Sequence, residues 1–251
     1  MADQVTEQLL DRFLTTVRPV VPLVSVWAHG SLGGGDYQQG RSDLDLIAVL
    51  ERPCTAAEER QLGEAHESLG RAVPLAARLH CGYLAAAELD DPERSHLTWA
   101  FEELMSRPVT AVTRRELHLF GRVLYGPPPT RLLPPVTDEQ LADFVVRDLA
   151  GFWRPALDHP ERFTRDIWVD SGLLTLARAA TTLRSGRLIT KGEALDVLTE
   201  LGAPAEVVAD IRRRRYGDPG PATDQWITRR AELALAFLGP AIERTLTAHR
   251  A

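Results

Sequence analysis

The sequence predicts an α/β (α+β) domain with a mixed sheet, followed by an all-α helical bundle. Short apolar runs that end in turn residues dominate the first half of the chain, whereas apolar residues at three- and four-residue spacing dominate the second. Between the halves, six of the ten residues from 126 to 135 are Gly or Pro, which interrupt regular structure. We therefore expect an N-terminal domain over residues 1–130 and a helical domain over residues 136–251.

The amino-acid composition limits which class the protein can belong to and which partners it can bind. The chain has 251 residues, of which 44% are hydrophobic and 25% charged, as in a globular protein with a sizeable core. Its net charge of −6 argues against a nucleic-acid partner and suits a cationic small-molecule substrate. Cys54 and Cys81 make neither a disulfide framework nor a zinc site, and no apolar run has membrane-spanning length. We expect a cytoplasmic protein without a membrane partner, present as a monomer or weak dimer.

Helices and strands are expected to alternate in the N-terminal half. Apolar residues at helical spacing predict a first helix, which Pro19 and Pro22 end. Thr55 is placed to cap a later helix that has acidic residues in its first turn. The expected helices are 5–17, 56–69 and 95–105, and the expected strands are 20–28, 43–50, 75–84 and part of 116–125.

Beyond the Pro-rich segment every element is expected to be helical. Residues 137–140, Thr-Asp-Glu-Gln, have the pattern of a capping box, in which side chains satisfy the first backbone N–H groups. The four consecutive arginines 212–215 spread around one helix, which predicts a solvated surface with one or two side chains turned inward. The expected helices are 138–157, 169–185, 191–201, 203–216 and 223–248.

The segment between the first two strands carries the strongest chemical signal. It contains Gly30-Ser31, a run of glycines, and then Asp43 and Asp45 at the start of an apolar strand. Residues two apart on a strand share a face, so the two carboxylates lie side by side and repel unless a cation separates them. Mg²⁺ takes carboxylate and phosphate oxygens together, and glycine backbone N–H groups with the Ser31 hydroxyl suit phosphate. The segment predicts a metal–nucleotide site, and a Gly-rich turn with surface aspartates is the alternative.

These pieces resemble a known superfamily. Gly-Ser, a short spacer and Asp-x-Asp at a strand start are typical of nucleotidyltransferases, in which the Asp pair holds metal ions for a nucleoside triphosphate. Residues 173–178 and 185–191 are similar to the second domain of the aminoglycoside (streptomycin/spectinomycin) 3″/9 O-nucleotidyltransferase family. The resemblance implies an ATP-dependent adenylyltransferase that moves AMP to a hydroxyl of an aminoglycoside-type antibiotic and releases pyrophosphate. It also implies two Mg²⁺ ions, ATP as co-substrate and a role in antibiotic resistance.

The same resemblance assigns roles to individual residues. Asp43 and Asp45 would hold the metal ions and belong to the catalytic centre. The expected nucleotide contacts are Gly30, Ser31, Ser42, Arg178, Lys191 and Tyr216, and the expected substrate contacts are Trp99, Trp168 and Asp170. Other readings stay open: a salt bridge for Arg178, an exposed helix start for Lys191, a helix N-cap for Asp170 and core packing for Trp99.

The third strand departs from the superfamily pattern. That strand often carries a further carboxylate, whereas residues 78–83 here offer none. His80 is the side chain there whose ordinary pKa suits a catalytic base near neutrality, and a hydrogen-bonded histidine in a half-buried strand is its alternative. Glu88 or a phosphate oxygen are the other candidate proton acceptors. The departure leaves open transfer to another small molecule or to a protein, or a catalytically impaired nucleotide-binding homologue.

Overall fold

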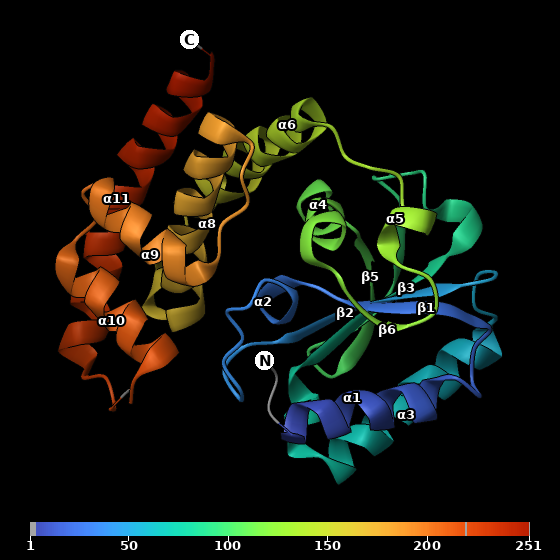
Figure 1. The fold of residues 1–251 in the computed structure, drawn as a ribbon. Helices are drawn as coiled ribbons and strands as arrows, with labels where there is room; N and C mark the ends of the chain where they lie inside the picture. Colours follow the sequence, from blue (N-terminus) through green and yellow to red (C-terminus); the bar gives the residue numbers. More distant parts are fainter. Residues whose placement is uncertain (1–3, 219, 251) are drawn as a thin grey trace. The chain divides into compact units, whose positions relative to one another are not determined.

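The computed structural model describes residues 4–218 and 220–250, and it divides into two compact units. The first ends at Val136 and contains the sheet, and the second begins at Thr137 and is helical. We call them the sheet unit and the helical unit (Figure 1). Within the described residues, no helix is long and apolar enough to cross a bilayer. The predicted fold class, a mixed α/β domain followed by a helical domain, is confirmed.

Six strands form one mixed sheet in the order β5-β4-β3-β2-β1-β6 (Figure 1). The neighbours β2 and β3 run parallel, and the other neighbouring pairs are antiparallel. A parallel pair needs a crossover connection, and the helix α3 provides it. The strands are β1 Leu23–Ala28, β2 Leu44–Leu50, β3 Leu79–Ala85, β4 Ser95–Ala100, β5 Glu103–Pro108 and β6 Arg122–Tyr125.

Helices cover both faces of this sheet. Figure 1 shows α1 and α3 on one side and α4 with α5 on the other. Phe13 of α1 packs in one core cluster with alternate residues of β2, and Leu117 of α4 packs in the cluster that contains Ile47 and Val49. The helices of the sheet unit are α1 Gln4–Val17, α2 Gly30–Gly33, α3 Ala56–Ala72, α4 Ala111–Phe120 and α5 Pro129–Leu132, with 3₁₀ turns at Pro74–Arg78 and Ala86–Glu88.

The helix expected over residues 95–105 is wrong, because this segment forms the hairpin β4–β5. Strand β4 pairs with β3, so the hairpin extends the sheet and satisfies backbone groups that a helix would have satisfied locally. Phe101 and Glu102 make the turn with φ of 55° and 62°. For ordinary side chains this left-handed conformation costs about 1–2 kcal/mol per residue. Tertiary pairing therefore overrides the local helical pattern.

Other boundaries differ by a few residues for local reasons. Pro74 opens a 3₁₀ turn, so the third strand begins at Leu79. The segment 116–125 holds the end of α4 and the edge strand β6, which pairs with β1. The predicted cap at Thr55 is present as a complete capping box with Glu58.

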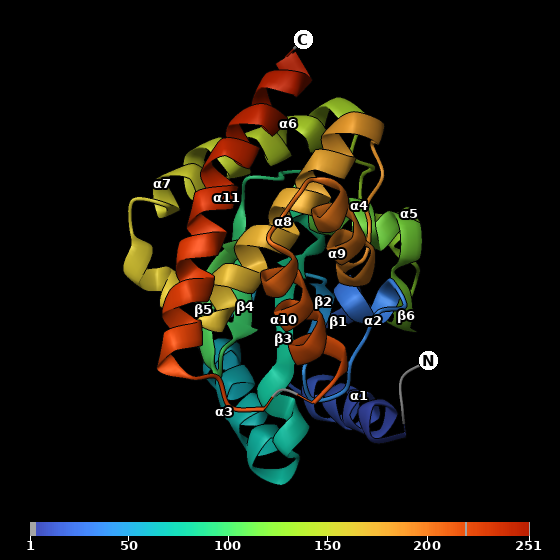
Figure 2. The ribbon, with the colours of Figure 1, turned by 90° about the vertical axis from the view of Figure 1, so that its left-hand side faces the viewer.

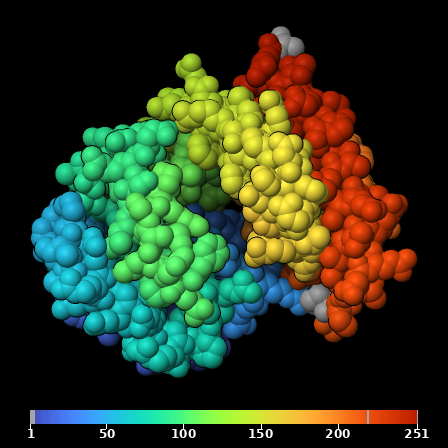
Figure 3. Space-filling view, turned by 180° about the vertical axis from the view of Figure 1, so that it is seen from behind, coloured from blue at the N-terminus to red at the C-terminus, as the bar shows by residue number. Residues whose placement is uncertain are grey.

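The helical unit is built around α8, which packs against both α9 and α11 (Figure 2). In the space-filling view α11 forms a continuous ridge, with residues of the α6–α8 segment beside it (Figure 3). The expected helix 138–157 is interrupted by a π-helical turn, Leu149–Trp153. Thr137 and Thr190 both form capping boxes. The α-helices are α6 Asp138–Asp148, α7 Arg154–Ala156, α8 Asp166–Ser185, α9 Lys191–Glu200, α10 Ala205–Tyr216 and α11 Asp224–Arg250, with a 3₁₀ turn at Pro160–Thr164.

Candidate functional site

The two aspartates lie where β2 begins. Asp43 directly precedes the strand and Asp45 is its second residue, with side chains 40% and 33% exposed. Arg78 Nη1 lies 3.5 Å from Asp43 Oδ1, and His80 Nδ1 lies 3.6 Å from Asp45 Oδ1. Each carboxylate thus has a basic neighbour, Arg78 from the end of the 3₁₀ turn and His80 from β3, and both carboxylates remain open to solvent.

The glycine turn is packed directly against the second carboxylate. Gly30 has φ of 58°, and a Cβ built on it would lie 2.6 Å from Asp45 Oδ2. The backbone N–H of His29 donates to the Asp45 carbonyl at 2.9 Å, which holds the turn at this place. Ser31 follows in the short helical turn α2. Glycine suits position 30 because other residues rarely adopt this φ, and a Cβ there would also force the Asp45 carboxylate to move.

Asp45 and His80 are also register partners on the sheet. They lie opposite each other on the parallel pair β2 and β3, and their side chains share the α4 face. Together with His29 they line a small cavity of about 120 Å³. Its remaining lining is Leu46, Ile47, Cys81, Gly82, Thr98, Ala100, Arg107, Pro108, Val109 and Thr113.

A second acid–base pair borders the cavity and was not predicted. His29 Nδ1 lies 3.2 Å from Glu116 Oε2, and the two side chains are 13% and 7% exposed. Glu116 comes from α4, 87 residues along the chain, so no local pattern could reveal the pair. Glu88, considered above as a proton acceptor, instead pairs with Arg94 at 3.0 Å.

The donor set suits a hard divalent cation. Among the described residues, no group of three or more His, Cys, Asp or Glu side chains is arranged to hold a metal ion. Mg²⁺ commonly takes only one or two carboxylates and completes its octahedron with phosphate oxygens and water. The solvent-facing pair Asp43 and Asp45 fits that requirement, and a protein-only cage does not form here.

Two predicted contacts lie away from this cavity. The Ser42 side chain is almost fully buried, and its hydroxyl accepts a hydrogen bond from the Gln38 backbone at 3.1 Å, which ties the loop before β2. Trp99 faces the opposite side of the sheet, where its ring stacks on His66 with centroids 4.6 Å apart. At 5% exposure it belongs to the core, so its assignment as a substrate contact is corrected.

The predicted nucleotide contacts of the helical unit lie close together. Arg178 of α8 donates from Nε to the Ile189 carbonyl at 3.1 Å, two residues before Lys191 begins α9. Tyr216 ends α10, and its hydroxyl lies 2.8 Å from the position of a Cβ built on Gly192. Three separate elements thus bring the predicted contacts to the first turn of α9.

Trp168 lies in a cluster of aromatic side chains. Its ring stacks on Phe152 at 6.1 Å and also contacts Trp153 and Phe163. Arg162 covers it with its guanidinium carbon 5.0 Å from the ring centroid. The π-helical turn that carries Phe152 and Trp153 brings both rings to Trp168.

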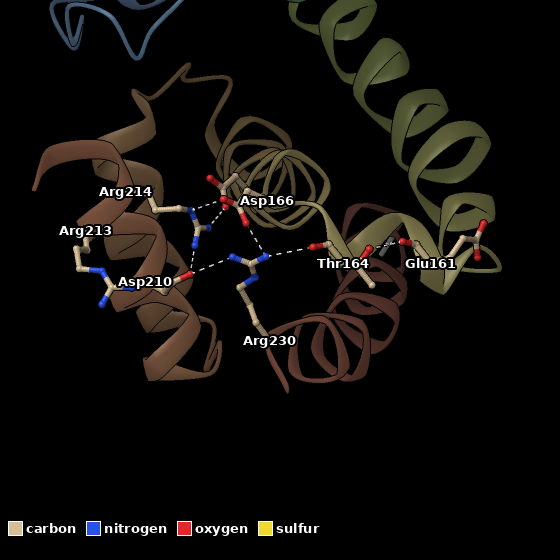
Figure 4. A network of polar contacts seen from close by, with 8 residues as sticks. Glu161, Thr164, Asp166, Asp210, Arg213, Arg214 and Arg230 are labelled. Atoms are coloured by element: carbon tan, nitrogen blue, oxygen red, sulfur yellow. Dashed lines mark hydrogen bonds and ion pairs between the residues drawn. The ribbon is translucent and has the colours of Figure 1, made fainter. Parts of the chain in front are cut away.

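Asp170 forms an ion pair with Arg214 inside the helical unit. Arg214 also pairs with Asp210, and the fully buried Arg230 bonds Asp166 at 2.6 Å and Asp210 at 3.3 Å (Figure 4). Burial raises the pKa of Asp170, and the Arg214 charge opposes that rise. Because α8 begins at Asp166, Asp170 is not a helix N-cap.

The four consecutive arginines 212–215 are distributed as the sequence predicts, with one side chain turned inward and others on the surface. Arg214 turns inward at 13% exposure, whereas Arg212 and Arg213 are about half exposed. Arg212 pairs with Asp196 at 2.7 Å, and Arg215 lies over the Tyr216 ring at 5.3 Å.

No protein-family model matches the sequence, and no curated protein matches it. Among solved structures, the chain resembles the spectinomycin adenyltransferase AAD(9) from Enterococcus faecialis, crystallised with ATP and spectinomycin. The TM-score is 0.69 at 15% sequence identity, over 94% of this chain and 99% of that chain. The chain therefore has the fold of that adenyltransferase over nearly its whole length, which is the fold that the family resemblance predicted.

Proposed function

We propose that the protein is an ATP-dependent O-adenylyltransferase that acts on a hydroxyl of an aminocyclitol or aminoglycoside, with spectinomycin and streptomycin as the first acceptors to test. One observation carries the proposal: Gly30 is packed against the Asp45 carboxylate at the start of β2, beside Asp43. This arrangement combines two metal-binding carboxylates with a turn whose backbone can approach a phosphate. The fold shared with the spectinomycin adenyltransferase supports it.

In the proposed reaction the acceptor hydroxyl attacks the α-phosphorus of ATP, a new O–P bond forms, and pyrophosphate leaves. Asp43 and Asp45 would hold Mg²⁺, whose charge would offset the negative charge of the phosphates. Ser31 and the backbone of its turn donate hydrogen bonds to phosphate oxygens, and Arg178 with Lys191 supply positive charge to the nucleotide. We do not assign Ser42 to the nucleotide, because its hydroxyl is buried in the loop.

The acceptor proton needs a destination, and His80 is our candidate. Its imidazole lies beside Asp45 and lines the same cavity. A histidine at this position replaces the carboxylate that the superfamily often has on its third strand. General base catalysis by a positioned imidazole contributes about 10²- to 10⁴-fold.

The deciding experiment measures pyrophosphate release from ATP and Mg²⁺, with spectinomycin and streptomycin offered separately. We expect acceptor-dependent release by the wild type, and its loss in Asp45→Asn. Asp11→Asn is the matched control, because Asp11 is an exposed acid on α1. Release that persists in Asp45→Asn would refute the assignment of the metal site.

A second reading has a specific observation in its favour. The absence of a third-strand carboxylate suits an enzyme for another small molecule or a protein, or an impaired nucleotide-binding homologue. ATP binding that needs Asp45, with no release for either antibiotic, would support that reading.

A further inference from the structure

The two turn residues of the hairpin β4–β5 have a backbone conformation that their side chains disfavour. Phe101 and Glu102 both have positive φ, 55° and 62°. Two-residue turns of this kind strongly favour Asn, Asp or Gly, because other side chains crowd the backbone in this conformation. Strain of this type persists where surrounding structure holds it, and it gathers at sites that contact ligands.

Because of this turn, the Phe101 ring lies on the face of the sheet opposite to the one that regular strand alternation would give it. Trp99, two residues earlier, points to the α3 face and stacks on His66. Regular alternation would send residue 101 to that same face. Instead, the Phe101 ring lies 4.9 Å from the His80 ring, which is on the α4 face with Asp45.

The Phe101 ring is exposed to solvent although two side chains lie close to it. Phe101 is 63% exposed, an unusual state for a phenylalanine. The guanidinium carbon of Arg107 lies 5.1 Å from its centroid, and the His80 ring meets it at 65°. Both neighbours line the cavity that contains Asp45. The turn therefore holds an aromatic surface beside the atoms proposed to react.

We propose that Phe101 is a specificity-determining contact for the acceptor, whose cyclitol or sugar ring stacks its apolar C–H face on the exposed phenyl ring. This inference rests on the proposed function and names the part of the acceptor that the site recognises. Saturated rings that carry several hydroxyls present C–H groups above and below the ring, and these are attracted to the negative face of an aromatic ring. A ring stacked here would lie beside His80, where one hydroxyl can meet the base.

The test separates acceptor binding from nucleotide binding. In Phe101→Ala we expect the KM for spectinomycin to rise about tenfold while the KM for ATP is unchanged, because one stacking contact is lost. Phe101→Trp keeps an aromatic face and should stay within about threefold of the wild type. Leu119→Ala is the control, since Leu119 is a similarly exposed apolar side chain on α4, outside the cavity lining. An unchanged acceptor KM in Phe101→Ala would overturn the proposal and leave the proposed function intact.

A stability measurement excludes a purely structural role. Phe101→Gly removes the ring and also relieves the positive φ. We expect it to unfold at a higher denaturant concentration than Phe101→Ala and to show the same rise in acceptor KM. If Phe101→Gly were no more stable than Phe101→Ala and had the acceptor KM of the wild type, the Phe101 ring would have a structural role and no role in acceptor binding.

The contact can also be tested if no antibiotic is turned over. Saturation-transfer NMR from the protein's aromatic protons to the C–H protons of spectinomycin or myo-inositol reports stacking without catalysis. A signal in the wild type that weakens in Phe101→Ala and persists in Leu119→Ala supports the contact, even if transfer fails. Equal signals in the wild type and Phe101→Ala, or none in the wild type, would count against it.

Discussion

Asp45 and His80 lie opposite each other on the parallel strands β2 and β3, with Oδ1 and Nδ1 3.6 Å apart. The pair puts an imidazole directly beside a proposed metal ligand, on the third strand, where the nucleotidyltransferases that the sequence resembles often have a carboxylate. The Asp45 carboxylate would stabilise the positive charge on an imidazole that accepts a proton here.

We expect His80→Gln to lower kcat for adenylyl transfer by about 100-fold or more, because the base is lost while the ring position stays polar. His80→Glu introduces the carboxylate that is common on this strand in the nucleotidyltransferases that the sequence resembles, and it should retain more activity than His80→Gln. Steady-state kinetics and calorimetric ATP binding measure the two effects separately. Equal kcat in the wild type and His80→Gln would exclude His80 as the base.

Gly30→Ala should abolish activity and weaken Mg²⁺ binding, because its methyl group would press on the Asp45 carboxylate. Mg²⁺ with ATP should raise the Tm of the wild type and have little effect on this variant. Gly35→Ala is a matched control: Gly35 has φ of 77°, yet nothing lies within 4 Å of its added Cβ. Both substitutions place an alanine at a positive φ, so their backbone strain is similar and only Gly30→Ala should lose activity. An equal loss of activity in the two variants would mean that backbone strain alone causes it.

His66 should make the protein less stable as the pH falls. Burial lowers its pKa from 6.5 to about 3, and its Nε2 lies 2.6 Å from the Tyr83 hydroxyl. As the pH falls through 6.5, the imidazole takes up a proton in the unfolded chain but stays neutral in the folded chain. The free energy of unfolding therefore drops by about 2 kcal/mol between pH 8 and pH 5. Denaturant unfolding at both pH values should show this drop in the wild type and a smaller one in His66→Gln. His159→Gln, at an exposed position, should keep the full drop.

Asp210→Asn should destabilise the helical unit by about 3–5 kcal/mol, because it leaves buried arginine charge without its partner. Asp210 is 5% exposed and bonds Arg230, which is fully buried, as well as Arg214 (Figure 4). The exposed pair of Asp196 and Arg212 provides the control, and Asp196→Asn should cost less than about 1 kcal/mol. Chemical denaturation measures both, and similar losses would mean that burial of the network contributes little.

Local sequence patterns determined the helix starts and the segment that carries the two aspartates. Thr55, Thr137 and Thr190 each precede a residue three positions later that completes a capping box, so these helix starts are encoded within four residues. The spacing of Asp43 and Asp45 likewise needs only the two-residue period of a strand. Such features depend on neighbours in the chain, which is why the fold class and the Asp-pair segment could be predicted.

Only the tertiary structure decided the contacts between distant residues. The residues after Arg94 have local features that a helix tolerates, yet pairing with β3 makes them a hairpin and turns Phe101 toward His80. Glu116 meets His29 across 87 residues, and Arg214 meets Asp170 across 44. The free energy of these contacts comes from strand pairing, burial and charge neutralisation between remote segments, and no period or motif within one segment contains that information.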